Sequence, residues 1–177
     1  MTSNGKSEHT LYWEKWASPF GPITVSCSAK GVRELSFGAP KKLRVGGNGT
    51  PGLTRAGSKR DPGATITRQA LAELRQYAAG RRKRFTVPLD LEGTPFQLKV
   101  WKALVEIPYG ETRSYQQIAC QAGNPRAARA VGMANHWNPV AIIVPCHRVI
   151  ASDGTLGGYG GGLDLKTRIL QLEQSGR

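Results

Sequence analysis

Three helix-start signals crowd the segment 94–125, and they constrain the fold of this 177-residue chain more than any other feature. Residues 94–97 (Thr-Pro-Phe-Gln) supply a threonine cap, a proline at the first helical position and a glutamine three residues after the cap. Residues 114–117 (Ser-Tyr-Gln-Gln) form a second capping box, and residues 124–125 (Asn-Pro) mark a third start. Short helices that begin so close together predict a helical domain in residues 93–177.

The second and third of these helices form a predicted helix-turn-helix unit. The second helix is expected to end at Gly123, and the third to run over residues 125–136 after a three-residue turn. The third helix is rich in alanine and carries Arg126 and Arg129. Small side chains make few contacts with base edges but let the backbone come close, which suits the narrow minor groove of DNA. A helix packed by its alanines against the core, with Arg129 merely solvated, is the alternative.

The first half of the chain predicts a smaller, strand-rich domain with one helix. Residues 11–37 hold two or three strand-like runs separated by turns. Apolar residues recur at helical spacing over residues 66–78, and residues 85–91 are again strand-like. The expected fold class is therefore mixed α/β, of the α+β kind. The expected organisation is a flexible tail at 1–10, an N-terminal domain at 11–92 and a C-terminal domain at 93–177.

Residues 40–64 differ in composition from the rest of the chain. They contain six glycines, three prolines and six Lys or Arg residues, against one acid, Asp61. Such a segment has little apolar surface to bury, so we expect a flexible basic loop. A tolerated insertion is favoured over a role in attracting DNA.

The charge of the chain favours a polyanionic partner. Its 25 Lys and Arg residues face 12 Asp and Glu residues, for a net charge of +13. Nucleic acid is the first candidate and an anionic membrane the second, with solubility alone as the plain alternative. No stretch approaches the roughly 18 to 20 apolar residues of a membrane span, and no secretory signal is recognisable. The three cysteines are too few for a disulfide framework and suit a reducing compartment.

The chemistry-bearing residues of the C-terminal domain follow a buried run at 140–144. A thiol and an imidazole adjoin there, at Cys146 and His147. A thiolate is the nucleophile of cysteine chemistry, and a neighbouring base makes it available near neutral pH. The glycine-rich loop 153–163 comes next, where the backbone could approach a ligand closely and Tyr159 offers a flat face for a base.

Two further residues, Cys27 and Glu173, have structural interpretations from their positions in the sequence. Cys27 lies on the apolar side of a strand-like run, which favours a core thiol. Glu173 could orient His147 as a carboxylate orients a catalytic base, but spacing alone favours an exposed acid at a helix end.

Residues 145–150 (Pro-Cys-His-Arg-Val-Ile) resemble the active-site signature of the O6-alkylguanine-DNA alkyltransferases. The resemblance covers essentially all of residues 94–177, in order, whereas the first half resembles the family only loosely. The other matching segments are 96–97 with 100–101, 107–112, 114–115, 129–132, 138–139 and 161–163.

The resemblance implies an RNase H-like N-terminal domain and a C-terminal domain with a winged helix-turn-helix. It implies that Cys146 accepts the alkyl group, that His147 deprotonates it through a water, and that Glu173 supports His147. Asn138 matches the residue that holds the active-site turn. Tyr115 matches a tyrosine that assists at N3 of the leaving guanine.

The resemblance also implies the contacts with DNA. Arg129 matches the finger that fills the base stack after the damaged nucleotide flips out. Tyr159 and Gly160 match the pocket wall and a backbone N–H near O6, and the Val149 carbonyl matches a contact to the exocyclic amine. Further DNA contacts are expected from Arg126, Ala127, Ala130 and Tyr115.

The implied function is DNA repair by irreversible transfer of an alkyl group from O6 of guanine to Cys146, once per molecule, with O4 of thymine as a second candidate position. The partner is double-stranded DNA, bound in the minor groove with low sequence specificity. No cofactor and no metal are expected, because the zinc ligands of some family members are missing. A cytoplasmic monomer is expected (at the nucleoid in a bacterium, in the nucleus of a eukaryote), with cooperative binding left open.

Three other functions stay open from the residues alone. Related alkyltransferase-like proteins carry Trp in place of the cysteine, so a non-catalytic binder of alkylated DNA is the first alternative, although this chain keeps Cys146. A Cys-His hydrolase is the second. A plain helix-turn-helix regulator is the third, but it leaves Cys146 and His147 unexplained.

Overall fold

The computed structural model describes residues 10–38, 53–56 and 61–176. The chain divides into two compact units, Met1–Leu91 (unit 1) and Glu92–Arg177 (unit 2). Unit 1 combines a four-stranded sheet with one long helix and unit 2 is mainly helical, which confirms the expected mixed α/β class. Within the described ranges, no helix is long and apolar enough to cross a membrane.

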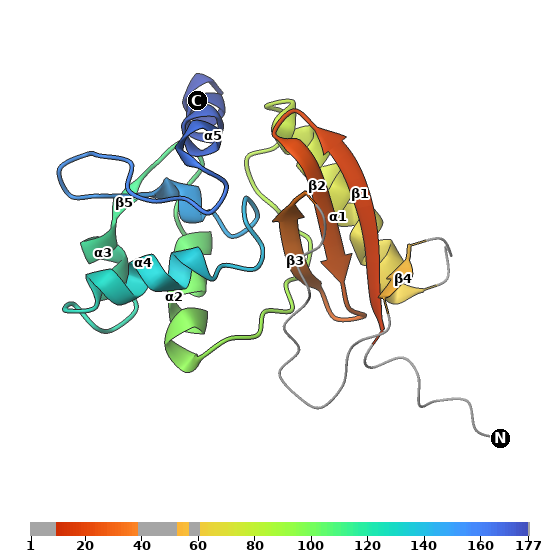
Figure 1. Ribbon diagram of the computed structural model, residues 1–177, viewed down its shortest axis with the longest axis horizontal. Coiled ribbons are helices and arrows are strands. Elements are labelled where there is room, and N and C mark those ends of the chain that lie inside the picture. Colours follow the sequence, from red (N-terminus) through yellow and green to blue (C-terminus); the bar gives the residue numbers. More distant parts are fainter. Residues whose placement is uncertain (1–9, 39–52, 57–60, 177) are drawn as a thin grey trace. The chain divides into compact units, whose positions relative to one another are not determined.

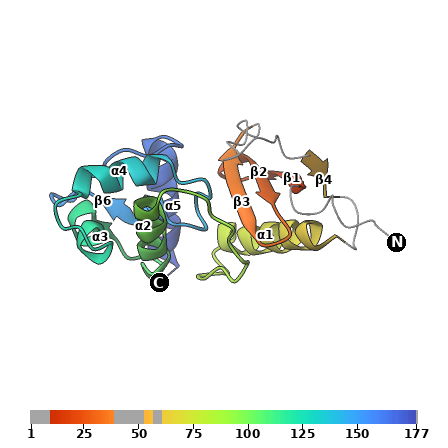
Figure 2. The ribbon, with the colours of Figure 1, turned by 90° about the horizontal axis from the view of Figure 1, so that it is seen from below.

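Unit 1 is a sheet covered on one face by a helix (Figures 1 and 2). The strand order is β3-β2-β1-β4, with the first three strands antiparallel and β4 parallel to β1. The helix α1 contacts the sheet closely, since the Thr67 hydroxyl donates to the Tyr12 carbonyl at 3.2 Å. The elements are β1 (Leu11–Ser18), β2 (Gly21–Cys27), β3 (Val32–Phe37), β4 (Leu53–Arg55) and α1 (Pro62–Ala78).

The predicted loop at 40–64 was wrong in part. It contains the strand β4, and its last three residues already belong to α1, which begins at Pro62. Proline suits the first turn of a helix because its missing N–H would have no intrahelical partner there. The rest of the predicted loop, at 40–52 and 57–60, lies outside the described residues, as do residues 1–9 of the predicted tail.

The strand predicted at 85–91 was also wrong. Only an isolated bridge between Leu89 and Val32 forms there. The backbone N–H groups of Thr86 and Val87 donate to the carboxylate of Glu73 on α1, at 2.8 and 3.2 Å, and Pro88 has no N–H to offer. The segment therefore has the apolar pattern of a strand, but two of its backbone N–H groups bond to the Glu73 side chain instead of to another strand.

Unit 2 is a cluster of four α-helices with a small two-stranded sheet. Trp101 is almost fully buried, and its indole N–H donates to the Ala134 carbonyl at 2.9 Å, which fixes α4 against α2. The strands β5 and β6 pair in parallel. The elements are α2 (Pro95–Val105), β5 (Arg113–Ser114), α3 (Tyr115–Gln121), α4 (Ala128–His136), the 3-10 helix η1 (Cys146–Arg148), β6 (Val149–Ile150) and α5 (Leu163–Ser175).

Both predicted capping boxes of unit 2 form. The hydroxyl of Thr94 accepts from the N–H of Gln97 at the start of α2, and the Gln97 side chain accepts from the N–H of Thr94. Ser114 and Gln117 make the same exchange at α3. The sequence predicted these two starts because their capping bonds are local.

The third start was predicted too early. The helix α4 begins at Ala128 rather than Pro125, and residues 122–127 connect it to α3 in place of a three-residue turn. Asn124 caps a turn instead of a helix, since its side-chain oxygen accepts from the Arg126 N–H at 3.3 Å and its carbonyl accepts from the Ala127 N–H at 3.0 Å. Arg126 and Ala127 therefore lie before the helix.

The segment between α4 and η1 is a tight turn held by Asn138. The Asn138 amide N–H donates to the Val144 carbonyl at 2.8 Å, and its oxygen accepts from the Val140 N–H at 3.0 Å. Ile142, fully buried in this turn, has a φ of 72°, a conformation that branched residues rarely adopt. Cys146 follows this turn, separated from it only by Pro145.

Candidate active site

The carboxylate of Glu173, on the last helix of unit 2, lies at the centre of a buried network. It accepts from Arg148 Nε at 2.9 Å and from Arg148 Nη2 at 2.8 Å, a bidentate pair. The backbone N–H of Gly110 donates to it at 3.0 Å, and His147 Nε2 lies 3.0 Å from its Oε1. The spacing-based expectation of an exposed acid was wrong, because Glu173 is fully buried.

The surroundings of Glu173 keep it ionised. Burial alone would raise the pKa of the carboxyl, but the hydrogen bonds from His147 and Arg148, with the positive charge of Arg148, hold that pKa well below its usual range. Arg148 also donates from Nη1 to the Ile107 carbonyl at 2.6 Å. One ion pair thereby links α5 and η1 to the segment after α2.

The ionised Glu173 fixes the protonation of His147. A carboxylate can only accept, so Nε2 of His147 carries the proton and donates it to Oε1 of Glu173. Burial lowers the pKa of His147 and outweighs the opposing effect of Glu173, so the ring is neutral. Nδ1 is therefore the unprotonated nitrogen, and within the described residues it has no hydrogen-bond partner. The ring offers a basic lone pair inside the unit.

Cys146, the first residue of η1, is buried beside this histidine. Burial raises the pKa of its thiol, while the Asn138 side chain, the charge of Lys166 and two backbone N–H groups act in the opposite direction. The resting group is a neutral thiol with groups in place to stabilise its thiolate. Asn138 thus acts on the thiol as well as on the turn before it.

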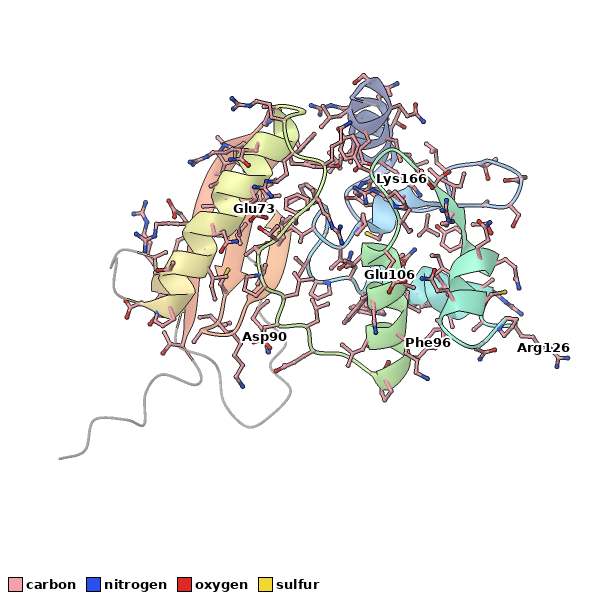
Figure 3. All side chains as sticks on the ribbon, turned by 180° about the vertical axis from the view of Figure 1, so that it is seen from behind. Glu73, Asp90, Phe96, Glu106, Arg126 and Lys166 are labelled. Atoms are coloured by element: carbon pink, nitrogen blue, oxygen red, sulfur yellow. The ribbon has the colours of Figure 1, made fainter. Side chains whose placement is uncertain are left out.

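Lys166 belongs to the same cluster, and sequence reasoning missed it. It lies on α5 at full burial and donates to the carbonyls of Val149, at 2.6 Å, and Leu156 (Figure 3). Burial lowers the pKa of its ammonium group to about 8, and the negative charge of a Cys146 thiolate acts to raise it. The only sequence signal for it was the position of Lys166 on the apolar side of the last helix. The Val149 carbonyl, expected to face a ligand, has this lysine as a partner.

Tyr115 and Tyr159 border the same site. Burial raises the pKa of both phenols, and the negative charge of a Cys146 thiolate acts in the same direction, so each phenol keeps its proton at neutral pH. A Cβ added at Gly157 would stand 2.6 Å from the Tyr115 hydroxyl, so the loop passes directly over that ring. The hydroxyl of Tyr159 is buried and has no hydrogen-bond partner among the described residues, and Gly160 beside it is exposed.

Apart from Tyr115, the predicted DNA-contacting residues lie outside this network. Arg129 and Ala130 are exposed in the first turn of α4. Arg126 extends from the outer end of the α3–α4 turn, away from the unit (Figure 3), and Ala127 is half-buried beside it. Gly132 of α4 faces Tyr115, since a Cβ there would be 3.8 Å from the ring. Tyr115 therefore lies between the helix α4 and the glycine-rich loop.

The other two cysteines differ from Cys146. Cys27 is buried in unit 1, where burial raises the pKa of its thiol to about 12, as expected of a core thiol. Cys120 is exposed on α3. Among residues 10–38, 53–56 and 61–176, no three His, Cys, Asp or Glu side chains gather as a metal site requires.

Comparison with protein families gives two matches that together span most of the chain. Residues 11–91 match the "6-O-methylguanine DNA methyltransferase, ribonuclease-like domain". Residues 95–175 match the "6-O-methylguanine DNA methyltransferase, DNA binding domain". The resemblance inferred from the sequence is confirmed.

Individual relatives agree with the family matches. A Mycobacterium bovis protein named methylated-DNA–protein-cysteine methyltransferase is 60% identical over 165 residues, which cover 93% of each chain. A Methanosarcina barkeri protein of the same name is 45% identical over 166 residues, covering 93% of this chain and 98% of the relative. The crystal structure of Mycobacterium tuberculosis OGT in complex with DNA matches with a TM-score of 0.79 at 46% identity, over 93% of this chain and 94% of that one.

Replacing Glu173 with Gln should lower the free energy of unfolding by about 3 to 5 kcal/mol at neutral pH, because Arg148 would stay buried without its counter-ion. Urea denaturation measures this. The control is Glu111→Gln, which breaks an ion pair with Arg113 whose side chains are 42% and 38% exposed. That change should cost about 1 kcal/mol or less.

The cost of Glu173→Gln should depend on pH. Because the folded-state pKa of Glu173 is lowered, its contribution is present above the unfolded pKa of about 4.3 and is lost as the pH falls toward the folded value. The difference between wild type and variant should shrink in acid. A difference that stays constant at low pH would contradict the assigned ionisation.

Replacing Lys166 with Met should raise the pKa of the Cys146 thiol, because the buried positive charge that favours the thiolate is removed. The rate of alkylation of Cys146 by iodoacetamide, followed by peptide mass spectrometry from about pH 6 to about pH 8, where wild-type Lys166 is still charged, should be lower in the variant. Lys99→Met, which removes an exposed charge from α2, is the control. Superimposable profiles of the two variants would exclude this role for Lys166.

Proposed function

The chain belongs to the 6-O-methylguanine DNA methyltransferase family, which repairs DNA by transferring an alkyl group to a protein cysteine, and we propose that Cys146 is that cysteine. The observation that carries the proposal is the state of His147, the residue next to the Cys146 thiol. Its ring is neutral, its Nε2 is hydrogen-bonded to Glu173, and its Nδ1 is unprotonated. No other cysteine of the chain has a buried base beside it in the described structure.

Thiolate formation is the first step of the proposed reaction. The Cys146 proton passes through a water to Nδ1 of His147, which becomes an imidazolium stabilised by the Glu173 carboxylate. Asn138 and the charge of Lys166 favour the resulting thiolate. Burial keeps the thiol protonated otherwise, so the nucleophile is generated only when a proton can be relayed.

Alkyl transfer follows as an in-line displacement. The sulfur of Cys146 forms a bond to the alkyl carbon while the bond from that carbon to O6 breaks, and the electron pair stays with guanine. Tyr115 is protonated at neutral pH because its pKa is raised. It donates this phenol proton to N3 of the leaving base. The product is a thioether, and no described group is arranged to cleave it, so each molecule turns over once.

The base must leave the duplex to reach Cys146, and α4 is suited to assist. Its small residues allow close approach to a minor groove, and the exposed Arg129 can fill the gap in the stack. Arg126, Ala127 and Ala130 contribute the neighbouring contacts. Such binding reads little sequence, which suits a lesion that can occur at any guanine.

The pocket for the extruded base is proposed to be the space between Cys146 and the glycine-rich loop. Tyr159 forms its wall, and the N–H of Gly160 can donate to O6. The Val149 carbonyl keeps one lone pair for the exocyclic amine, since a carbonyl accepts twice and Lys166 uses one position.

The protein is proposed to act as a cytoplasmic monomer. Its three cysteines are all free, as thiols are in a reducing compartment. One copy of the chain supplies every residue of the proposed reaction.

Intact mass tests the acceptor. Incubation with excess duplex carrying one O6-methylguanine should add about 14 Da, located on Cys146, and then stop. Cys146→Ala should abolish the addition and keep DNA binding, whereas Cys120→Ala should behave as wild type. Lesion binding without a mass change would support a damage-binding protein, and repeated turnover would support a hydrolase; either result overturns the proposal.

Arg129→Ala separates base flipping from chemistry. Repair of O6-methylguanine in duplex DNA should slow by about tenfold or more, because the flipped state loses the group that fills the stack. Reaction with free O6-benzylguanine should stay within about twofold, since no flipping is needed. Lys99→Ala removes one exposed charge elsewhere on unit 2 and serves as the control. Equal losses on both substrates would exclude the flipping role.

A further inference from the structure

We propose that unit 1 carries a second surface for DNA, formed by the exposed cations at the carboxyl end of α1, which binds the phosphate backbone of duplex DNA without reading sequence. The inference rests on the proposed function only in taking DNA as the partner. We call this surface the α1 platform, and it comprises Arg75, Arg81, Lys83 and Arg84.

The charge of this region is one-sided. Residues 62–89 contain six Lys or Arg residues and a single acid, Glu73. Glu73 is 4% exposed and lies 3.8 Å from Arg82, which balances its charge, so the exposed cations keep theirs. Among the described residues, neither Arg81 nor Arg84 has a carboxylate partner. A cluster of exposed guanidinium groups is what a phosphate backbone binds, both by charge and by hydrogen bonding.

The backbone of the platform is fixed by the way α1 ends. Gly80 adopts a φ of 69°, its N–H donates to the Tyr77 carbonyl at 2.9 Å, and the N–H of Arg81 donates to the Gln76 carbonyl at 2.9 Å. This pair of bonds is a Schellman motif, which satisfies the last carbonyls of a helix. The remaining negative end of the helix dipole, about half a charge, is smaller than the charge of four cations.

Glu73 anchors the far side of the same loop (Figure 3). Its carboxylate accepts from the Thr86 N–H at 2.8 Å, the Thr86 hydroxyl at 2.5 Å and the Val87 N–H at 3.2 Å. The ring of Phe85 packs 5.3 Å from that of Tyr77 on α1. The cations between Gly80 and Phe85 therefore stand on a short segment held at both ends, which lowers the entropy cost of binding.

The side chain of Arg82 bonds within the loop and is not part of the α1 platform. Its Nε donates to Gln76 at 2.8 Å, its Nη1 donates to the Arg84 carbonyl at 2.8 Å, and Nη1 lies 3.8 Å from Glu73. Arg82 thereby ties the backbone of Arg84 to α1, and the Arg84 side chain is exposed. Arg75 extends the platform along the helix, with its guanidinium 5.8 Å from the Trp16 ring.

Two exposed lysines of unit 1 provide a control matched in number and sign of charge. Lys15 lies on the face of β1 opposite to α1, because the side chains of the alternate residues Tyr12 and Trp16 lie against that helix, at Gly63 and Arg75. Lys30 lies near the other end of α1, since Ser28 in the same turn contacts Gly63. The helix has 17 residues and spans about 25 Å, so Lys30 is far from the platform.

The test compares Arg81→Ala/Arg84→Ala with Lys15→Ala/Lys30→Ala, both in the full chain. The measurement is the Kd for unmodified duplex DNA as a function of salt. Loss of two phosphate contacts should weaken binding several-fold and reduce the slope of log K against log salt by about 2. The lysine control should keep the wild-type slope, and Arg81→Lys/Arg84→Lys should restore most of it.

Reaction with free O6-benzylguanine is measured in parallel, because it needs no DNA. Wild-type protein that fails to react there would overturn the proposed function, whereas normal reaction with an unchanged slope in the arginine variant would overturn the platform alone. Binding of wild type to anionic lipid vesicles that is lost in the arginine variant, with the DNA slope unchanged, would also overturn it, in favour of a membrane surface. The alanine substitutions leave the loop intact, because only the backbone of Arg81 and Arg84 takes part in its bonds.

Discussion

The hydrogen-bonded carboxylate of Glu173 is the interaction on which unit 2 depends. Arg148 balances its charge, so the buried network needs no further cation and His147 can remain neutral. A neutral ring with its proton held toward Glu173 must carry its lone pair on the opposite nitrogen. The charge balance of the core thus decides the protonation of the base beside Cys146. The same carboxylate also joins α5 to η1 and to Gly110, so stability and chemistry share one group.

The two units use the same physical device for different ends. Each buries one carboxylate that accepts from several donors far away in the chain, Glu73 in unit 1 and Glu173 in unit 2. A buried carboxylate is tolerated only when its lone pairs are satisfied, so each one fixes the segments that supply the donors. In unit 2 these segments carry a base and a nucleophile. In unit 1 they hold a loop whose exposed side chains are almost all cationic.

The features that the sequence predicted correctly are those set by neighbours in the chain. The capping boxes at Thr94 and Ser114 formed because their bonds close within three residues. Asn124 shows the limit of this reasoning, since the same side chain can cap a turn, and only the start of α4 at Ala128 distinguishes the two. The strand predicted at 85–91 was wrong for a longer-range reason. Two of its backbone N–H groups donate to the carboxylate of Glu73, more than ten residues away, instead of to a neighbouring strand.

The sequence by itself determined the family, the mixed α/β class and the placement of Cys146 beside His147, because these depend on local patterns and on an ordered set of motifs. Only the tertiary structure decided that Glu173 is buried against His147 and that Lys166 lies in the same cluster. The physical reason is that the protonation of a buried group depends on every charge and dipole around it. Those charges come from segments whose separation in sequence says nothing about their separation in space.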